Sequence, residues 1–138
     1  MTETQFAYLA GLIDGEGTVG AWRNSRGYYQ PQVSITMTHE PTILWLQATF
    51  GGNVHMEKGQ TDKHKAKWKW QCMSSPIREF LPKALPYMIT KHRQAELVLQ
   101  LLGMRQRGAN VGSGLNNVEA QAAICSELKE INRRGVAV

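Results

Sequence analysis

Two carboxylates stand close together near the N-terminus, at the end of an apolar segment and among glycines. Asp14 and Glu16 flank Gly15, and Gly17 follows. Carboxylate and backbone carbonyl oxygens are the hard ligands that Mg²⁺ prefers, so Glu16 with the carbonyl of Gly15 is a candidate metal site. The competing interpretation is an amphipathic helix that simply ends at glycines, but a carboxylate between two glycines has no packing purpose.

The same glycines also satisfy the G-x-G-x-x-G pattern of dinucleotide sites, as Gly15, Gly17 and Gly20. Such a site needs a strand before the pattern and a helix after it. Here the predicted helix comes first and the predicted strand follows. The sequence therefore argues against nucleotide binding.

Residues 9–17, LAGLIDGEG, resemble the motif of the LAGLIDADG homing endonuclease family. They differ from it only at Gly15, where alanine is usual, and at Glu16, which replaces the second acid conservatively. The context agrees, because a predicted helix leads directly into a strand hairpin. The resemblance covers about the first hundred residues and implies a single-motif, homodimeric type with the saddle-shaped αββαββα core of that family.

What the resemblance implies is a site-specific endonuclease. It would bind a long, near-palindromic double-stranded DNA target as a homodimer and hydrolyse one phosphodiester on each strand, leaving short 3′ overhangs. Glu16 becomes the essential metal-binding acid of each subunit, with Mg²⁺ as cofactor and Mn²⁺ as a substitute. The metal would activate water and neutralise charge on the scissile phosphate, whereas Asp14 is expected to cap or orient helix ends.

Small residues in the motif favour close contact between two copies of the first helix. Ala10 and Gly11 would let the helices pack almost backbone to backbone, near a two-fold axis. One carboxylate from each copy would then converge there. The predicted dimer interface consists of five consecutive motif residues, namely Leu9, Ala10, Gly11, Leu12 and Ile13.

Two further residues are candidates for catalysis. Residues 86–97 are similar to the family's stretch in which a lysine lies beside the active site, which makes Lys91 a candidate to act on the solvent network or stabilise phosphate charge. A solvated charge at a helix start is the alternative. His39 falls where the family places a polar, water-ordering residue, and a helix-capping or surface histidine fits that position equally well.

The elements that must position these residues follow from hydrophobic periodicity and from glycine and proline signals. The predicted order is α-β-β-α-β-β-α-α-α, an α+β fold with an antiparallel sheet. We expect one domain over 1–138, with a core over about 1–107 and a C-terminal loop and helix over about 108–138. The predicted elements are helices to about residue 14 and over 41–50, 75–81, 90–107 and 116–134, and strands over 18–24, 28–38, 53–58 and 65–73.

Alternation within the strands predicts one apolar and one polar sheet face. A two-stranded ribbon fits the major groove, where polar side chains read bases and lysines contact phosphates. An ordinary solvated face is the alternative, but the lysines of the last strand would repel one another without an anionic partner. The residues predicted to face DNA are Gly20, Trp22, Asn24, Arg26, Gln30, Gln32, Ser34, Thr36, Thr38, His55, Lys65, Lys67, Lys69 and Gln71.

Composition narrows the function classes further. Sixteen Lys and Arg against eleven Asp and Glu leave a formal charge of +5, which suits a polyanionic partner. No apolar run approaches the roughly 18 residues of a membrane span, and the first residues lack signal- or transit-peptide features. We therefore expect no membrane, and action inside the cell where the target DNA resides, in bacterial cytoplasm or an organelle. Cys72 and Cys125 lack metal or disulfide spacing and should be reduced, structural thiols.

Two functions from other classes remain open. An intron maturase would bind intron RNA with the same basic sheet face, although a pure binding module has no need of Glu16. A transcription factor of this fold would need an added DNA-binding domain, for which the residues after Arg107 are too few. A single motif without intein-type splice residues favours a free-standing or intron-encoded protein.

Overall fold

The order of elements predicted above is confirmed. The computed structural model describes residues 1–23, 25, 27, 29–58, 66–104 and 118–133. Predicted boundaries at residues 24, 28, 65, 107, 116 and 134 lie outside these residues. Its elements are α1 (Glu3–Glu16), β1 (Gly17–Arg23), β2 (Tyr29–Met37), α2 (Glu40–Phe50), β3 (Asn53–Glu57), β4 (Lys67–Met73), α3 (Ser75–Ala84), the 3₁₀ turn η1 (Leu85–Tyr87), α4 (His92–Met104) and α6 (Val118–Arg133).

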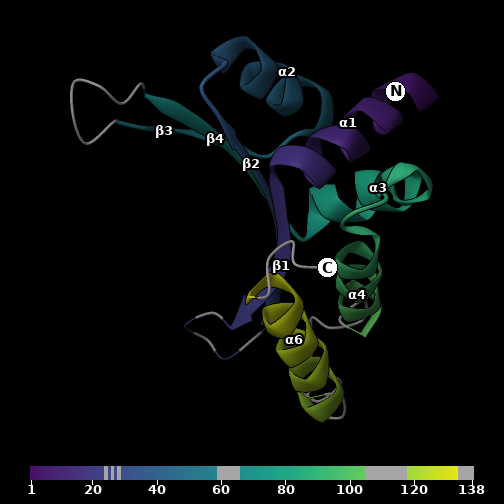
Figure 1. Cartoon of the computed structure of the whole chain (residues 1–138). Coiled ribbons are helices and arrows are strands. Elements are labelled where there is room, and N and C mark those ends of the chain that lie inside the picture. The colour runs from purple at the N-terminus through teal and green to yellow at the C-terminus, as the bar shows by residue number, and fades with distance from the viewer. Residues whose placement is uncertain (24, 26, 28, 59–65, 105–117, 134–138) are drawn as a thin grey trace.

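The four strands form one antiparallel sheet in the order β1-β2-β4-β3, which confirms the α+β class. Helices α1 to α4 lie on one face of this sheet, while α6 lies beside β1 and α4 (Figure 1). No helix of the described residues covers the opposite face, which we call the uncovered face. Pro31 is tolerated inside β2 because the pairing with β4 begins only at Gln32, so β2 has a neighbour on one side at that position.

The core lies between the sheet and the helices. Trp70 of β4 and Phe80 of α3 are fully buried, with ring centroids 5.6 Å apart. The Trp70 indole N–H donates to the Gly51 carbonyl at 2.7 Å, which satisfies its polar atom in an apolar setting. A Cβ on Gly52, whose φ is +93°, would lie 2.5 Å from the Cys72 sulfur. Only glycine therefore fits where the chain passes from α2 to β3.

Helix α1 begins with a capping box and ends later than predicted. The Thr2 hydroxyl accepts from the Gln5 N–H, and the Thr2 N–H donates to the Gln5 side chain. The sequence predicted an end near Asp14, at a glycine turn, but the helix continues through Glu16. The break falls at Gly17, because a Cβ there would lie 2.9 Å from the Ile13 backbone and β1 starts at once.

Two other helix boundaries within the described residues differ from the prediction by more than one residue. Helix α3 runs through Pro82 to Ala84 rather than stopping near residue 81, so the helix accommodates the loss of the one backbone hydrogen bond that Pro82 cannot donate. Helix α4 begins at His92 rather than Thr90. Both cysteines are free and buried as predicted, and burial raises the pKa of the Cys72 thiol to about 12. Among the described helices, none is both long and apolar enough to cross a membrane.

Candidate active site and nucleic-acid interface

The C-terminal end of α1 is tied to the segment that leads into α4. The Ile89 N–H donates to Asp14 Oδ2 at 2.7 Å, and the Lys91 N–H donates to Asp14 Oδ1 at 3.0 Å. The Lys91 ammonium in turn donates to the Asp14 backbone carbonyl at 2.8 Å. Asp14 thus orients two helix ends, as expected from the sequence, and it also holds Lys91 against the last turn of α1, which ends at Glu16.

A second contact fixes the other end of α1. The Tyr87 hydroxyl donates to a Glu3 carboxylate oxygen at 2.6 Å, and this bond raises the pKa of the Tyr87 phenol. The segment from Tyr87 to Lys91 is therefore bonded to both ends of the motif helix. Because its backbone and side chains are held in this way, Lys91 has a defined position at the end of α1.

Glu16 is the last residue of α1, and its carboxylate is exposed. Among the described residues it forms neither a hydrogen bond nor an ion pair, so its oxygens remain available to a cation. The Gly15 carbonyl belongs to the last turn of α1, where carbonyls lack a partner within the helix. The described residues contain no group of three or more acids, histidines or cysteines that could hold a metal. One chain therefore offers a partial set of hard oxygen ligands.

His39 lies just past β2, whose Ile35 pairs with Gly17 at the end of α1. It occupies the N-cap position of α2, and its Nδ1 lies 2.7 Å from the Thr42 hydroxyl oxygen. Within the described part of the chain it forms no hydrogen bond with Glu16 or Lys91. The structure thus brings Lys91 to the end of the motif helix and places His39 at the start of α2, beside Tyr8 and Trp45.

The uncovered sheet face carries the described residues that the alternation assigned to it. Strand register aligns Thr36, Lys69 and His55 in one row across three strands, and Trp22 opposite Gln30 in another. The core side chains Val33, Ile35 and Trp70 point the other way. Thr38 is exposed just past β2, and Gly20 is covered. Of the residues predicted to face DNA, Asn24, Arg26 and Lys65 lie outside the described residues.

The register adds residues that the sequence prediction missed. Asn53 pairs with Gln71, Met73 pairs with Gln32, and Thr18 pairs with Ser34, so all three belong to the uncovered face. Extending the two-residue alternation by one step in each strand would have found them. Glu57 pairs with Lys67, so an acid lies opposite one lysine and the argument from lysine repulsion is weaker than the sequence suggested.

The predicted dimer interface needs a correction, because three of its five residues are inaccessible. Leu9, Ala10 and Ile13 are completely buried, on the side of α1 that faces the core of their own chain. Gly11 is exposed and Leu12 half-buried, on the outer side of the helix. The outer side also carries Tyr8, Gly15 and Thr4, which the prediction left out.

The outer side of α1 is shaped for close approach. A Cβ placed on Gly11 or Gly15 would meet nothing within 4 Å, so neither glycine is required by packing within the chain. The two stand one helical turn apart on the same side, where they leave backbone accessible. A second helix could therefore pack closely against this strip.

The chain is similar to known homing endonucleases in sequence and in fold. No family model matches it. The DNA endonuclease I-CvuI of Chlorella vulgaris is 31% identical over 110 aligned residues, in an alignment that covers 72% of this chain and 65% of the relative. The chain thus spans just under two thirds of the length of that curated relative.

Solved structures share the fold. A crystal structure of I-CvuI in complex with its target, in the presence of Ca, has a TM-score of 0.75 and 22% identity, over 94% of this chain and 82% of that one. The archaeal intron-encoded homing endonuclease I-Vdi141I complexed with DNA has a TM-score of 0.72 and 19% identity, over 94% and 84%. At this level of identity the likeness establishes the fold.

Proposed function

Because the chain belongs to the LAGLIDADG homing endonuclease family, we propose that it is a site-specific DNA endonuclease, active as a homodimer with divalent metal ions. The observation that carries this proposal is the junction at the end of α1, where Lys91 is bonded to Asp14 and the Glu16 carboxylate has no partner among the described residues. The packing of the helix end does not require an acid at this position, and the exposed Glu16 carboxylate is accessible to a cation. A metal-binding acid beside a lysine that can stabilise phosphate charge suits the hydrolysis of a phosphodiester.

Glu16 and the Gly15 carbonyl are the residues that would hold Mg²⁺, since both offer hard oxygens. When bound, the metal supplies charge neutralisation at the phosphate and acidifies water. The remaining ligands would come from phosphate oxygens and from Glu16 of a second copy. Mn²⁺, which also prefers oxygen ligands, should substitute. Lys91, fixed at the helix end, would stabilise the negative charge that develops on the phosphate.

Dimerisation follows from the need to cut two strands. One chain provides one metal-binding acid, and two chains joined through the Gly11 and Gly15 side of α1 would bring two such acids together at a two-fold axis. The uncovered faces of both sheets would then lie along one duplex, with side chains reading the major groove. We therefore propose a long, near-palindromic double-stranded target and cleavage with short 3′ overhangs, within the compartment that holds that DNA.

Intron RNA is the alternative ligand for the same face. The basic and polar side chains of the face suit either nucleic acid, and maturase activity would not depend on Glu16. Competition between the cleavage target and structured intron RNA for wild-type protein measures this preference. We assign the nuclease as the main function because of the junction at α1.

The decisive experiment separates binding from cleavage. Digestion of randomised duplex DNA with purified protein and Mg²⁺, followed by sequencing of the ends, identifies the target. On that target, Glu16→Gln should bind as the wild type does and fail to cleave, because it loses the charge that holds the metal while the sheet face is unchanged. Glu79→Gln, an exposed acid on α3, is the matched control and should cleave normally. Cleavage by Glu16→Gln at a near wild-type rate would remove Glu16 from the mechanism.

A further inference from the structure

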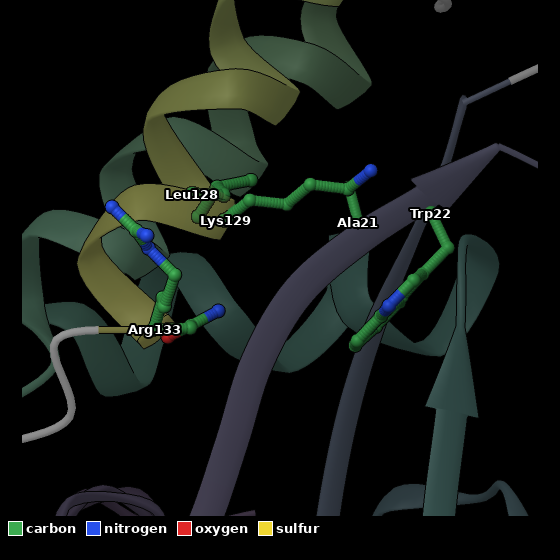
Figure 2. Close-up of a pocket in the computed structure, with 6 residues that line it drawn as sticks. Ala21, Trp22, Leu128, Lys129 and Arg133 are labelled. Carbon is green, nitrogen blue, oxygen red and sulfur yellow. The ribbon is translucent and has the colours of Figure 1, made fainter.

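A pocket of about 370 Å³ opens between the end of α6 and strand β1 (Figure 2). Its size falls within the range of about 300–1,000 Å³ that is common for ligand sites. It combines apolar and cationic side chains from two elements far apart in the sequence. The lining residues are Ala21, Trp22, Leu128, Lys129, Asn132 and Arg133.

The pocket is continuous with the uncovered sheet face. The missing side chain of Gly20 lets two lining residues pack over its backbone, since a Cβ there would lie 3.1 Å from the Trp22 ring and 3.2 Å from the Asn132 amide nitrogen. The Asn132 amide also donates to the Val19 carbonyl at 3.0 Å, which holds the last turn of α6 against β1. The aromatic ring and the helix end therefore meet at the margin of the face proposed to lie on DNA.

The charge around the pocket is positive. Lys129 and Arg133 are both exposed and stand one turn apart on α6, a spacing at which like charges repel. Arg133 pairs with Glu130 at 2.7 Å, whereas no carboxylate of the described residues lies within 4.0 Å of the Lys129 ammonium. Figure 2 shows the Lys129 side chain extending from α6 toward β1 near Ala21. The two cations at the pocket are therefore balanced by only one carboxylate partner among the described residues, which suits an anionic ligand.

The apolar wall narrows the choice of ligand. Trp22 is 43% exposed and Leu128 closes the α6 side, so the pocket offers apolar surface beside its two cations. A sugar–phosphate unit has the matching chemistry, because the sugar ring has apolar faces and the phosphate is an anion. Positive side chains next to the groove-reading surface typically contact phosphates.

We propose that this pocket holds a sugar–phosphate segment of the duplex just beyond the stretch covered by the sheet face. The sugar lies against Trp22 and Leu128, and the phosphate is bound by Lys129 and Arg133. This inference rests on the proposed function, since it extends the same DNA interface outward. It adds affinity that is independent of base sequence.

The test couples protein variants to duplex length. Each phosphate contact contributes about 0.9 to the slope of log K against log salt. Because the pocket is proposed to hold one phosphate, Lys129→Ala/Arg133→Ala should lower that slope by about 0.9 per chain on a duplex with long flanks. On duplexes trimmed from both ends the wild-type slope should fall by the same amount, and there the variant should match the wild type. Arg78→Ala/Lys83→Ala, which removes two exposed cations from α3, controls for net charge.

The outcomes are distinguishable. If the Lys129→Ala/Arg133→Ala variant has the wild-type salt slope on the long duplex, the pocket assignment is wrong, while the proposed function still stands. An equal loss of salt slope on trimmed and long duplexes would also overturn the pocket assignment. The same loss of salt slope on a duplex whose flanking sequence is scrambled supports contact with the DNA backbone. A pocket that prefers unpaired bases would show the loss on single strands and not on duplex flanks, which also contradicts the proposal. If the wild type binds no duplex at all, the proposed function fails and the inference with it.

Discussion

Replacing Gly11 by alanine should change stability and assembly in opposite directions. Gly11 lies in the middle of α1 and is exposed, and an added Cβ would meet nothing within 4 Å in its own chain. Alanine is favoured over glycine inside a helix by about 0.5–1 kcal/mol. A single chain carrying Gly11→Ala should therefore be more stable by up to about 1 kcal/mol, which raises Tm by a few degrees.

The same methyl group should weaken the dimer. Where two helices approach nearly backbone to backbone, an added methyl from each copy forces them apart, and such overpacking costs about 1–3 kcal/mol. At about 1.4 kcal/mol for each factor of ten, the dimer Kd should rise about 5- to 150-fold. Cleavage should decline with it at protein concentrations below the new Kd.

A glycine elsewhere in the chain provides the control. Gly103 in α4 is also helical and exposed, and a Cβ added there would likewise meet nothing within 4 Å. Gly103→Ala should raise the stability of the chain and leave the dimer Kd unchanged. Thermal unfolding at dilute concentration measures the first effect, and sedimentation equilibrium measures the second. If Gly11→Ala and Gly103→Ala give the same dimer Kd, the two chains do not meet at Gly11 and the proposed assembly is wrong.

Three further predictions concern other parts of the molecule. Lys91→Met, which keeps the aliphatic stem and removes the ammonium bonded to the Asp14 carbonyl, should slow single-turnover cleavage with a smaller effect on DNA affinity, and an unchanged rate would exclude that role. Lys67→Ala/Lys69→Ala should weaken DNA binding and reduce its salt slope by about one unit per lost contact, whereas unchanged binding would show that β4 does not face DNA. Gly52→Ala should lower the free energy of unfolding, measured with urea, by about 2–4 kcal/mol, because of its positive φ and its contact with Cys72. A decrease no larger than that of an ordinary surface substitution would contradict the packing described for that loop.

Periodicity was sufficient to predict which side chains share a sheet face. Residues two apart point to the same side of a strand, so Ser34 and Thr36, or Lys67 and Lys69, could be assigned without any knowledge of strand pairing. The pairing itself was not predictable. That Glu57 lies opposite Lys67, and Asn53 opposite Gln71, depends on the register set by the hairpin.

The side of α1 that faces outward was harder to predict, because the helix is apolar nearly all round. Leu9, Ala10 and Ile13 face the core, and Leu12 with Gly11 faces away from it, yet all are apolar or small in the sequence. The contacts of Asp14 were equally hidden. Its two backbone partners follow 75 and 77 residues later, a separation that no local pattern encodes.

Helix α6 has a consequence for the solubility of the protein. Strand β1 is at one end of the sheet, and such an edge can pair with the strand of a neighbouring molecule and seed aggregation. By packing its last turns against β1 and using Asn132 to occupy the Val19 carbonyl, α6 obstructs that template. The opposite edge, β3, is five residues long and ends in charged Glu57, which discourages pairing by a different route. Helix α6 therefore protects the more vulnerable edge from self-association through the sheet.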